Sequence, residues 1–169
     1  MMIAQRFRIP LVLQIAIFLI PMNVYVIGDW MGAGIQWVFL RFIQFSGKNS
    51  IVLLPRELGM ILSGSLSGKS AFASIIWAVG AVLIIVATVL IISGAVKTNP
   101  DLLRKVAFVN TGAAVLFVLS TVFQYGILLH GPAGISIPFG ILVLLIIAYW
   151  QYQIACTSPV HEENIAESR

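Results

Sequence analysis

Four long apolar runs dominate the hydrophobic pattern of the chain, and every charged residue lies outside them. The runs cover residues 9–28, 71–96, 106–130 and 132–156. A helix needs about 20 apolar residues to cross about 30 Å of hydrocarbon, and each run reaches that length. The pattern therefore predicts four transmembrane helices.

These runs predict an all-α integral membrane protein, a four-transmembrane-helix bundle that forms one domain over residues 1–156. The first run is longer than the apolar part of a signal peptide, so we expect it to be a retained span. Residues 157–169 are polar and are predicted to form a cytoplasmic tail.

The segment between the first two runs, residues 29–70, is long and unusually apolar for a loop. Its stretches 35–45 and 50–62 are too short to span a bilayer. They predict either interfacial helices, apolar side down, or a hairpin that turns at residues 46–49. Apolar residues would lie on both faces of such strands, which makes an exposed sheet prone to aggregate and favours the helices. Pro55 is expected to start the last short helix, with Glu57 in its first turn.

Composition strengthens the membrane assignment, because the chain is 60% hydrophobic and 9% charged, against about 25% charged in soluble domains. The net charge of +4 comes from Lys and Arg at the ends of the apolar runs. No basic cluster with interleaved aromatics is present, so we expect no nucleic-acid partner. One cysteine and two distant histidines predict no disulfide, no metal site and no cofactor.

Lys and Arg also predict an orientation in the cell membrane. Six of the ten lie on the side of the two termini and the second loop, which places both termini in the cytoplasm under the positive-inside rule. These six residues are Arg6, Arg8, Lys97, Arg104, Lys105 and Arg169.

The stretch Ser63–Ser70 ends in Gly68-Lys69-Ser70 and resembles a phosphate-binding loop. The P-loop pattern requires a second glycine five residues before Gly68, and Ser63 stands there. The following run is also too long and too apolar for the helix of an α/β domain. We therefore expect a surface loop and no nucleotide.

Polar residues recur on one face of the predicted membrane helices. On the third run they follow steps of three and four residues, and the first run adds Gln14. They predict either packing between helices or the lining of a pore. The candidate stripe comprises Gln14, Asn110, Thr121 and Gln124.

A second candidate group lies in the first loop, as a contact surface or a charge cluster: Asp29, Trp37, Arg41, Arg56 and Glu57. Its carboxylates could carry acid–base chemistry at the membrane surface. Nothing nearby in the sequence supplies a nucleophile, a second base or a metal ligand, so no catalytic residue is assigned.

The order of a short N-terminus, a long first external loop, a tight basic turn and a short second external loop is similar to the four-span claudin-like group. The similarity covers the whole chain as topology. That group carries Gly-Leu-Trp followed by two cysteines in its first loop. Here Gly34-Ile35-Gln36-Trp37 holds the comparable Trp, and the loop has no cysteine. The similarity therefore implies a topology and no residue roles.

These features predict a non-enzymatic, small integral membrane subunit that packs in the lipid bilayer against other membrane proteins or copies of itself. The alternative is an oligomeric passive channel or small carrier lined by the stripe of the third run. A third possibility is a membrane-surface enzyme acting on lipid. The four runs contain no Asp, Glu, Lys or Arg, so ion-coupled transport is not expected.

Overall fold

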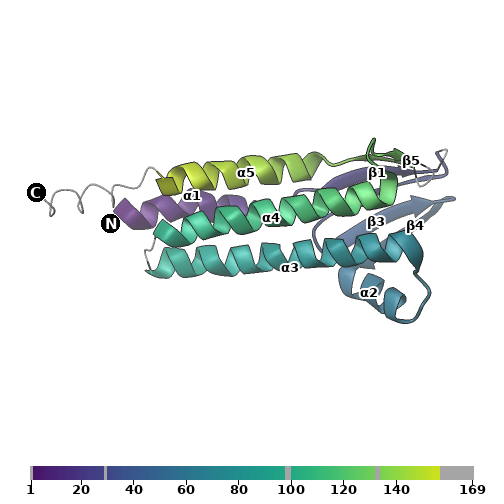
Figure 1. Ribbon diagram of the computed structural model, residues 1–169, viewed down its shortest axis with the longest axis horizontal. Coiled ribbons are helices and arrows are strands. Elements are labelled where there is room, and N and C mark those ends of the chain that lie inside the picture. Colours follow the sequence, from purple (N-terminus) through teal and green to yellow (C-terminus); the bar gives the residue numbers. More distant parts are fainter. Residues whose placement is uncertain (1, 29, 98–99, 132–133, 157–169) are drawn as a thin grey trace, which may run out of the picture.

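The structure, a computed structural model, describes residues 2–28, 30–97, 100–131 and 134–156, and these form five helices and one antiparallel sheet (Figure 1). The predicted tail, 157–169, and Asp29 lie outside the described residues. The six strands follow the order β4-β3-β2-β1-β6-β5. In chain order the elements are α1 (Met2–Ala16), β1 (Asn23–Ile27), β2 (Gly32–Gln36), β3 (Leu40–Phe45), β4 (Lys48–Leu53), α2 (Leu54–Leu62), α3 (Gly68–Lys97), α4 (Pro100–Tyr125), β5 (His130–Gly131), β6 (Gly134–Ile137) and α5 (Phe139–Cys156).

Three described helices are long and apolar enough to cross a membrane, which supports a membrane protein. Their candidate spans are Gly68–Val96, Asp101–Tyr125 and Phe139–Cys156. The apolar part of α1, Phe7–Ala16, is shorter and packs beside α3 and α5. The start of α1 and the end of α5 lie at one end of the molecule, and the sheet lies at the other (Figure 1).

The predicted all-α four-helix bundle is wrong, because strands replace the outer ends of predicted spans. The first helix ends at Ala16, and residues Asn23–Ile27 of the predicted span 9–28 form β1. The helix α4, in the predicted third span, ends at Tyr125, and α5, in the predicted fourth span, begins only at Phe139, after β6. β1 pairs with β6. The two strands satisfy each other's backbone groups across a large separation in sequence, which no local pattern reveals.

The interfacial-helix prediction for the first loop is also wrong for most of its length. Residues 32–53 form the meander of β2, β3 and β4, and the turn at Ser46-Gly47 has φ values of 50° and 77°. Positive φ at both positions is the geometry of a tight two-residue hairpin turn. The prediction that Pro55 starts a short helix with Glu57 in its first turn is confirmed by α2.

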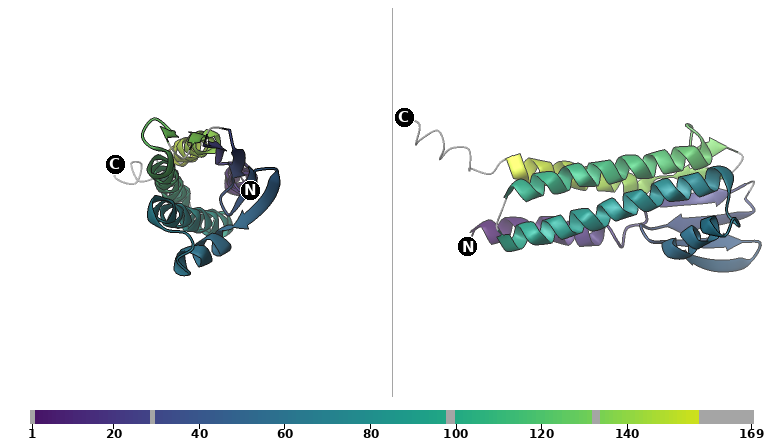
Figure 2. Two further views of the ribbon diagram at one scale, coloured as in Figure 1. Left: turned by 90° about the vertical axis from the view of Figure 1, so that its right-hand side faces the viewer. Right: turned by 60° about the horizontal axis from the view of Figure 1, so that its bottom comes forward.

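The sheet has the reverse polarity of an ordinary antiparallel sheet. Its face toward the helices carries buried polar or small residues, Asn23, Tyr25, Gly34, Gln36 and Ser136, beside the partly buried Ile43 and Val52. Its outer face carries an apolar row across five paired strands, Ile137, Val24, Ile35, Phe42 and Ile51. Antiparallel sheets usually bury the apolar side and solvate the polar side. The end-on view of Figure 2 shows the strands curving along one side of the molecule, with α3 and α4 on the other.

An apolar core joins the helices below the sheet. The Trp77 ring on α3 packs against Phe117 on α4, with 4.4 Å between ring centroids. Gly80, one turn along α3, leaves the room that the Phe117 ring occupies, because a Cβ there would lie 2.7 Å from the ring. The absence of one side chain thus lets α3 and α4 approach closely.

We predict opposite effects for two Gly→Ala changes. A Cβ at Gly34 would collide with the Tyr25 ring and lie 2.7 Å from the Phe42 carbonyl oxygen, so Gly34→Ala should destabilise the protein by about 1–3 kcal/mol. Gly59 in α2 has no neighbour within 4 Å of such a Cβ, so Gly59→Ala should stabilise the helix by about 0.5–1 kcal/mol. Chemical unfolding in detergent measures both. Equal effects of the two changes would contradict the placement of Tyr25 over Gly34.

Candidate functional site

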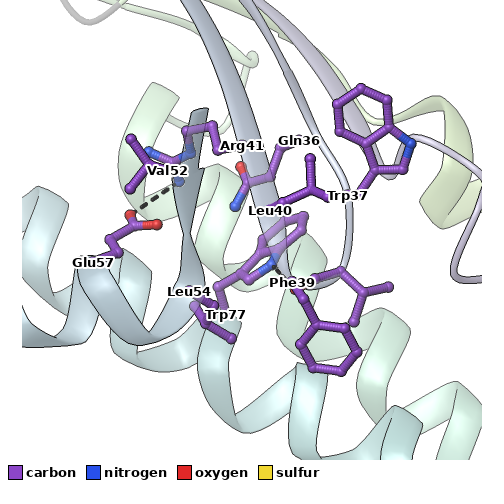
Figure 3. Close-up of a pocket in the computed structure, with 10 residues that line it drawn as sticks. Gln36, Trp37, Phe39, Leu40, Arg41, Val52, Leu54, Glu57 and Trp77 are labelled. Atoms are coloured by element: carbon purple, nitrogen blue, oxygen red, sulfur yellow. Dashed lines mark hydrogen bonds and ion pairs between the residues drawn. The ribbon is translucent and has the colours of Figure 1, made fainter. Parts of the chain in front are cut away.

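An ion pair joins the sheet to the short helix α2. The Arg41 guanidinium of β3 lies 3.2 Å from the Glu57 carboxylate (Figure 3). The side chain of Glu57 is 6% exposed and that of Arg41 is 26% exposed. At such burial, removal of either partner would leave a charge without compensation, so the pair holds α2 against the sheet.

Both partners of the ion pair make a further contact. The Ser74 hydroxyl of α3 donates a hydrogen bond to the Glu57 carboxylate. The Arg41 guanidinium carbon lies 5.8 Å from the centroid of the Tyr25 ring, within the range of a cation–π interaction. The pair therefore connects four elements, β1, β3, α2 and α3, at one point.

The turn between β2 and β3 is fixed to the helices by two indole groups. Trp77 of α3 donates to the Val38 carbonyl oxygen at 3.1 Å (Figure 3). Trp37 donates to the Leu19 carbonyl oxygen, also at 3.1 Å. The backbone N–H of Leu54 donates to the Phe39 carbonyl at 2.8 Å. The turn is thus held at three consecutive residues, 37–39.

The ion pair and the residues in contact with it, Tyr25, Arg41, Glu57 and Ser74, form a polar layer between the sheet and the helices. Within this layer Tyr25 is in its neutral form. Burial raises the pKa of Tyr25 well above its ordinary value, and the Arg41 charge opposes that shift only in part. The phenol is 4% exposed, and its oxygen has no hydrogen-bond partner among the described residues. Tyr25 therefore acts as a packing surface for Arg41 and offers no proton at neutral pH.

The polar layer has no room for an organic substrate. The cavity beside Arg41, lined by Asn23, Gln36, Thr121 and Gln124 among others, measures about 10 Å³, which is about the space of one water molecule. A second pocket, lined by Arg41, Leu54 and Trp77 among others (Figure 3), has no room for a water molecule. The arrangement can hold elements together, and it offers no cleft for chemistry.

A second polar cluster lies in the middle of the helices, far from the sheet. Asn110 of α4 donates to Gln14 of α1 at 2.7 Å and to Gln151 of α5 at 2.8 Å. Gln14 donates to Thr88 of α3 at 3.3 Å. All three amides are fully buried. Amides in an apolar interior need hydrogen-bond partners. Here the side chains of α1, α3, α4 and α5 supply these partners to one another.

The predicted polar stripe divides between these two places. Gln14 and Asn110 meet in the helical cluster. Thr121 and Gln124 lie at the sheet end, where Thr121 donates to the Phe117 carbonyl and Gln124 to the Ser70 hydroxyl. The structure thus does not bring the four residues into one continuous lining.

The predicted loop cluster divides as well. Arg41 and Glu57 form the ion pair. The Trp37 indole donates to the carbonyl oxygen of Leu19, which follows the end of α1. Arg56 is exposed on the other side of α2, and Asp29 lies outside the described residues. Lys69, in the stretch that resembles a phosphate-binding loop, is exposed in the first turn of α3. The loop before it connects α3 to the helix α2, whereas a P-loop follows a strand.

Several residues of both clusters were not among the sequence candidates: Asn23, Ser74, Trp77, Ser136 and Gln151. Gln151 was recoverable, because an amide within an apolar run needs a partner. Asn23 and Ser136 pair through a 2.6 Å hydrogen bond that depends on the β1–β6 pairing. No periodicity within one helix could indicate that contact.

Comparison with protein-family models and with curated proteins found no match to this chain. The similarity of layout to the claudin-like group therefore carries no residue assignments. The roles of the residues in both clusters rest on their own geometry.

We predict that Arg41 and Glu57 act as one energetic unit. Arg41→Met or Glu57→Gln alone should each lower the unfolding free energy by about 3 kcal/mol, because each leaves a largely buried group unpaired. The double variant should cost less than the sum. Arg56→Met, an exposed neighbour, should change stability by less than about 0.5 kcal/mol. Unfolding in detergent measures all four variants, and additive losses would show that the pair contributes no coupling.

Proposed function

We propose that this protein is a non-enzymatic, integral membrane subunit that packs laterally against another integral membrane protein through the outer face of its sheet. The observation that carries the proposal is the reversed polarity of the sheet. The apolar row on its outer face has no covering element among the described residues, whereas Asn23, Gln36 and Ser136 on the opposite face are buried.

Exposed apolar surface is unfavourable in water, and contiguous patches mark contacts with proteins or membranes. Ile51 is 62% exposed, Ile137 is 61% exposed and Val24 is 38% exposed. The same row contains Ile35 and Phe42, so it extends over five strands without a charged residue. A rigid sheet presents this row at a fixed curvature, which suits a protein surface of matching shape.

The position of the row favours a partner that lies in the same membrane. Val24 stands near the start of β1, beyond α1, and Ile137 ends β6 directly before α5. The turn after α1 and the helix α5 also expose apolar side chains, Leu19 and Leu142 respectively. The outer row is therefore continuous with surface of the kind that faces lipid. A membrane protein beside the bundle would cover both.

The orientation is part of the proposal. The start of α1 and the end of α5 share one end (Figure 1) with the exposed cations Arg8, Arg104 and Lys105. Short segments with Lys and Arg favour the cytoplasmic side. We therefore propose that the sheet lies outside the cytoplasm of the cell membrane and that both termini lie inside.

The other two functions fit less well. A channel requires the polar stripe to face a pore, but the amides of Gln14 and Asn110 bind each other in the interior of one copy. A lipid enzyme would rest on Asp29, Arg56 and Glu57, but Glu57 is buried against Arg41 and Arg56 is exposed, and Asp29 lies outside the described residues.

The test is mass measurement of the protein purified in native-membrane nanodiscs. We expect a defined stoichiometric complex with a second membrane protein. Ile51→Asn and Val24→Asn should each abolish it, because an amide in an apolar contact is left unpaired. Thermal stability should change little in Ile51→Asn, because the Ile51 side chain is 62% exposed, so this variant separates the contact from folding. Lys48→Asn, at the far end of β4, is the matched control and should retain the complex.

Two outcomes would overturn the proposal. A wild-type protein that stays monomeric would leave the apolar row to lipid alone. The channel would be favoured by two results together. The complex would contain copies of this chain only, and the solute flux in reconstituted liposomes would change on substitution of Thr121 or Gln124.

A further inference from the structure

A hollow of about 370 Å³ lies between α4 and α5, on a different side from the sheet cluster and the amide cluster. Pockets for small molecules usually measure about 300–1,000 Å³. Its floor is formed by Ala107 and Ala148, which are almost fully buried. Two alanines that face each other leave the space that larger side chains would fill.

The walls of this hollow, which we call the α4–α5 groove, run along the helix axes. On α4, Phe108 and Thr111 follow Ala107, and on α5 the wall is formed by Leu145, Tyr149 and Tyr152. Phe108 is 60% exposed and Tyr149 is 65% exposed, and both helices are candidate spans. The groove therefore opens sideways, toward the place of lipid.

A cation stands at one end of the groove. Arg104 lies one helical turn before Phe108 on α4. Its guanidinium carbon is 5.9 Å from the ring centroid of Phe108 and 5.9 Å from that of Tyr152. The two rings contact each other edge to face, at 5.9 Å between centroids. Arg104 is thus seated on a pair of aromatic rings that joins the two walls.

We propose that the α4–α5 groove binds an anionic phospholipid, with one acyl chain along Ala107 and Ala148 and the headgroup phosphate on Arg104. The guanidinium presents a planar fork of donors that matches a phosphate. Tyr149, Trp150 and Tyr152 lie near the same end of α5, as aromatic residues do where a span meets the headgroups. An apolar groove with one cation at its mouth complements a molecule with one charged end and a long apolar chain.

A free phosphate ion would use Arg104 alone and gain nothing from the groove. A lipid gains from both, because its acyl chain packs along the groove while its phosphate contacts Arg104, and in a bilayer such close packing is a main source of favourable free energy. The proposal therefore commits to the lipid. It is independent of the sheet face, since it uses other residues on other elements.

Native mass spectrometry of the protein, released from phosphatidylcholine nanodiscs with and without phosphatidylglycerol, tests the proposal. The wild type should retain one phosphatidylglycerol in preference to phosphatidylcholine. Arg104→Gln should weaken retention about tenfold, as expected for the loss of one charged hydrogen-bonding group. Lys105→Gln makes the same charge change on the adjacent exposed residue and should retain the lipid.

Thr111→Phe tests the groove without a change of charge, because the larger side chain would occupy its middle, and it should also lower retention. Thermal unfolding of each variant in phosphatidylcholine nanodiscs shows that it is folded. Equal weakening by Arg104→Gln and Lys105→Gln would reduce the effect to diffuse surface charge and overturn the site. Retention unaffected by Thr111→Phe would overturn the acyl-chain placement. Stabilisation by inorganic phosphate in phosphatidylcholine nanodiscs, lost in Arg104→Gln, would show an ion site in place of a lipid site.

Discussion

The pairing of the Arg41 guanidinium with the Glu57 carboxylate is the interaction on which the position of the sheet depends. The pair joins β3 to α2. The Ser74 hydroxyl adds a contact with α3, and the Tyr25 ring adds a contact with β1. Both charges have left water to a large extent, so each requires the other. The short helix α2 is otherwise held by few contacts, and Glu57 in its first turn also interacts favourably with the helix dipole. The polar side of the sheet faces inward because these groups need one another, and its apolar side is consequently left outside.

The long apolar helices α3, α4 and α5 were predictable in outline, because hydrophobicity over 18 or more residues is a strong and local signal. The sheet was not predicted. Val24-Tyr25-Val26-Ile27 and Ile135-Ser136-Ile137 are apolar enough to be counted in spans, and it is their pairing with each other and with β2 and β5 that makes them strands. Apolar residues on both strand faces favour helices in the first loop, because an exposed sheet of that kind would be prone to aggregate. In the structure, the start of α3 and the end of α4 lie along one of those faces, so only the other face is left open (Figure 1). Of the candidate residues, the Arg41–Glu57 and Gln14–Asn110 contacts each join residues named in advance. Gln151, an amide within an apolar run, could have been added from the sequence, whereas the contact of Ser74 with Glu57 depends on how α2 and α3 are placed in the whole fold.

The two polar clusters have different consequences for function. The amides of Gln14, Asn110 and Gln151 tie α1, α4 and α5 together inside the bundle, so α1 is fixed to the candidate spans although it is shorter than they are. The Arg41–Glu57 pair fixes the sheet on top of them. A rigid assembly of this kind supports recognition by shape, since little conformational entropy is lost when a preformed surface binds. The proposed functions of the sheet face and of the α4–α5 groove both depend on this rigidity, and neither requires a moving part or a reactive group.

Hydrogen exchange of the backbone amides in nanodiscs tests most directly whether the sheet and the helices form one unit. In the wild type, the amides of β1, β2 and β3 should exchange with the same opening free energy as those of α3 around Ser74 and Trp77, because cooperative units open together. In Glu57→Gln, the strands should exchange faster, while the amides of α4 and α5 around Asn110 and Gln151 keep their protection. Wild-type strands that exchange rapidly and independently of α3 would contradict the account, since the apolar row would then belong to a loosely attached sheet without a fixed shape.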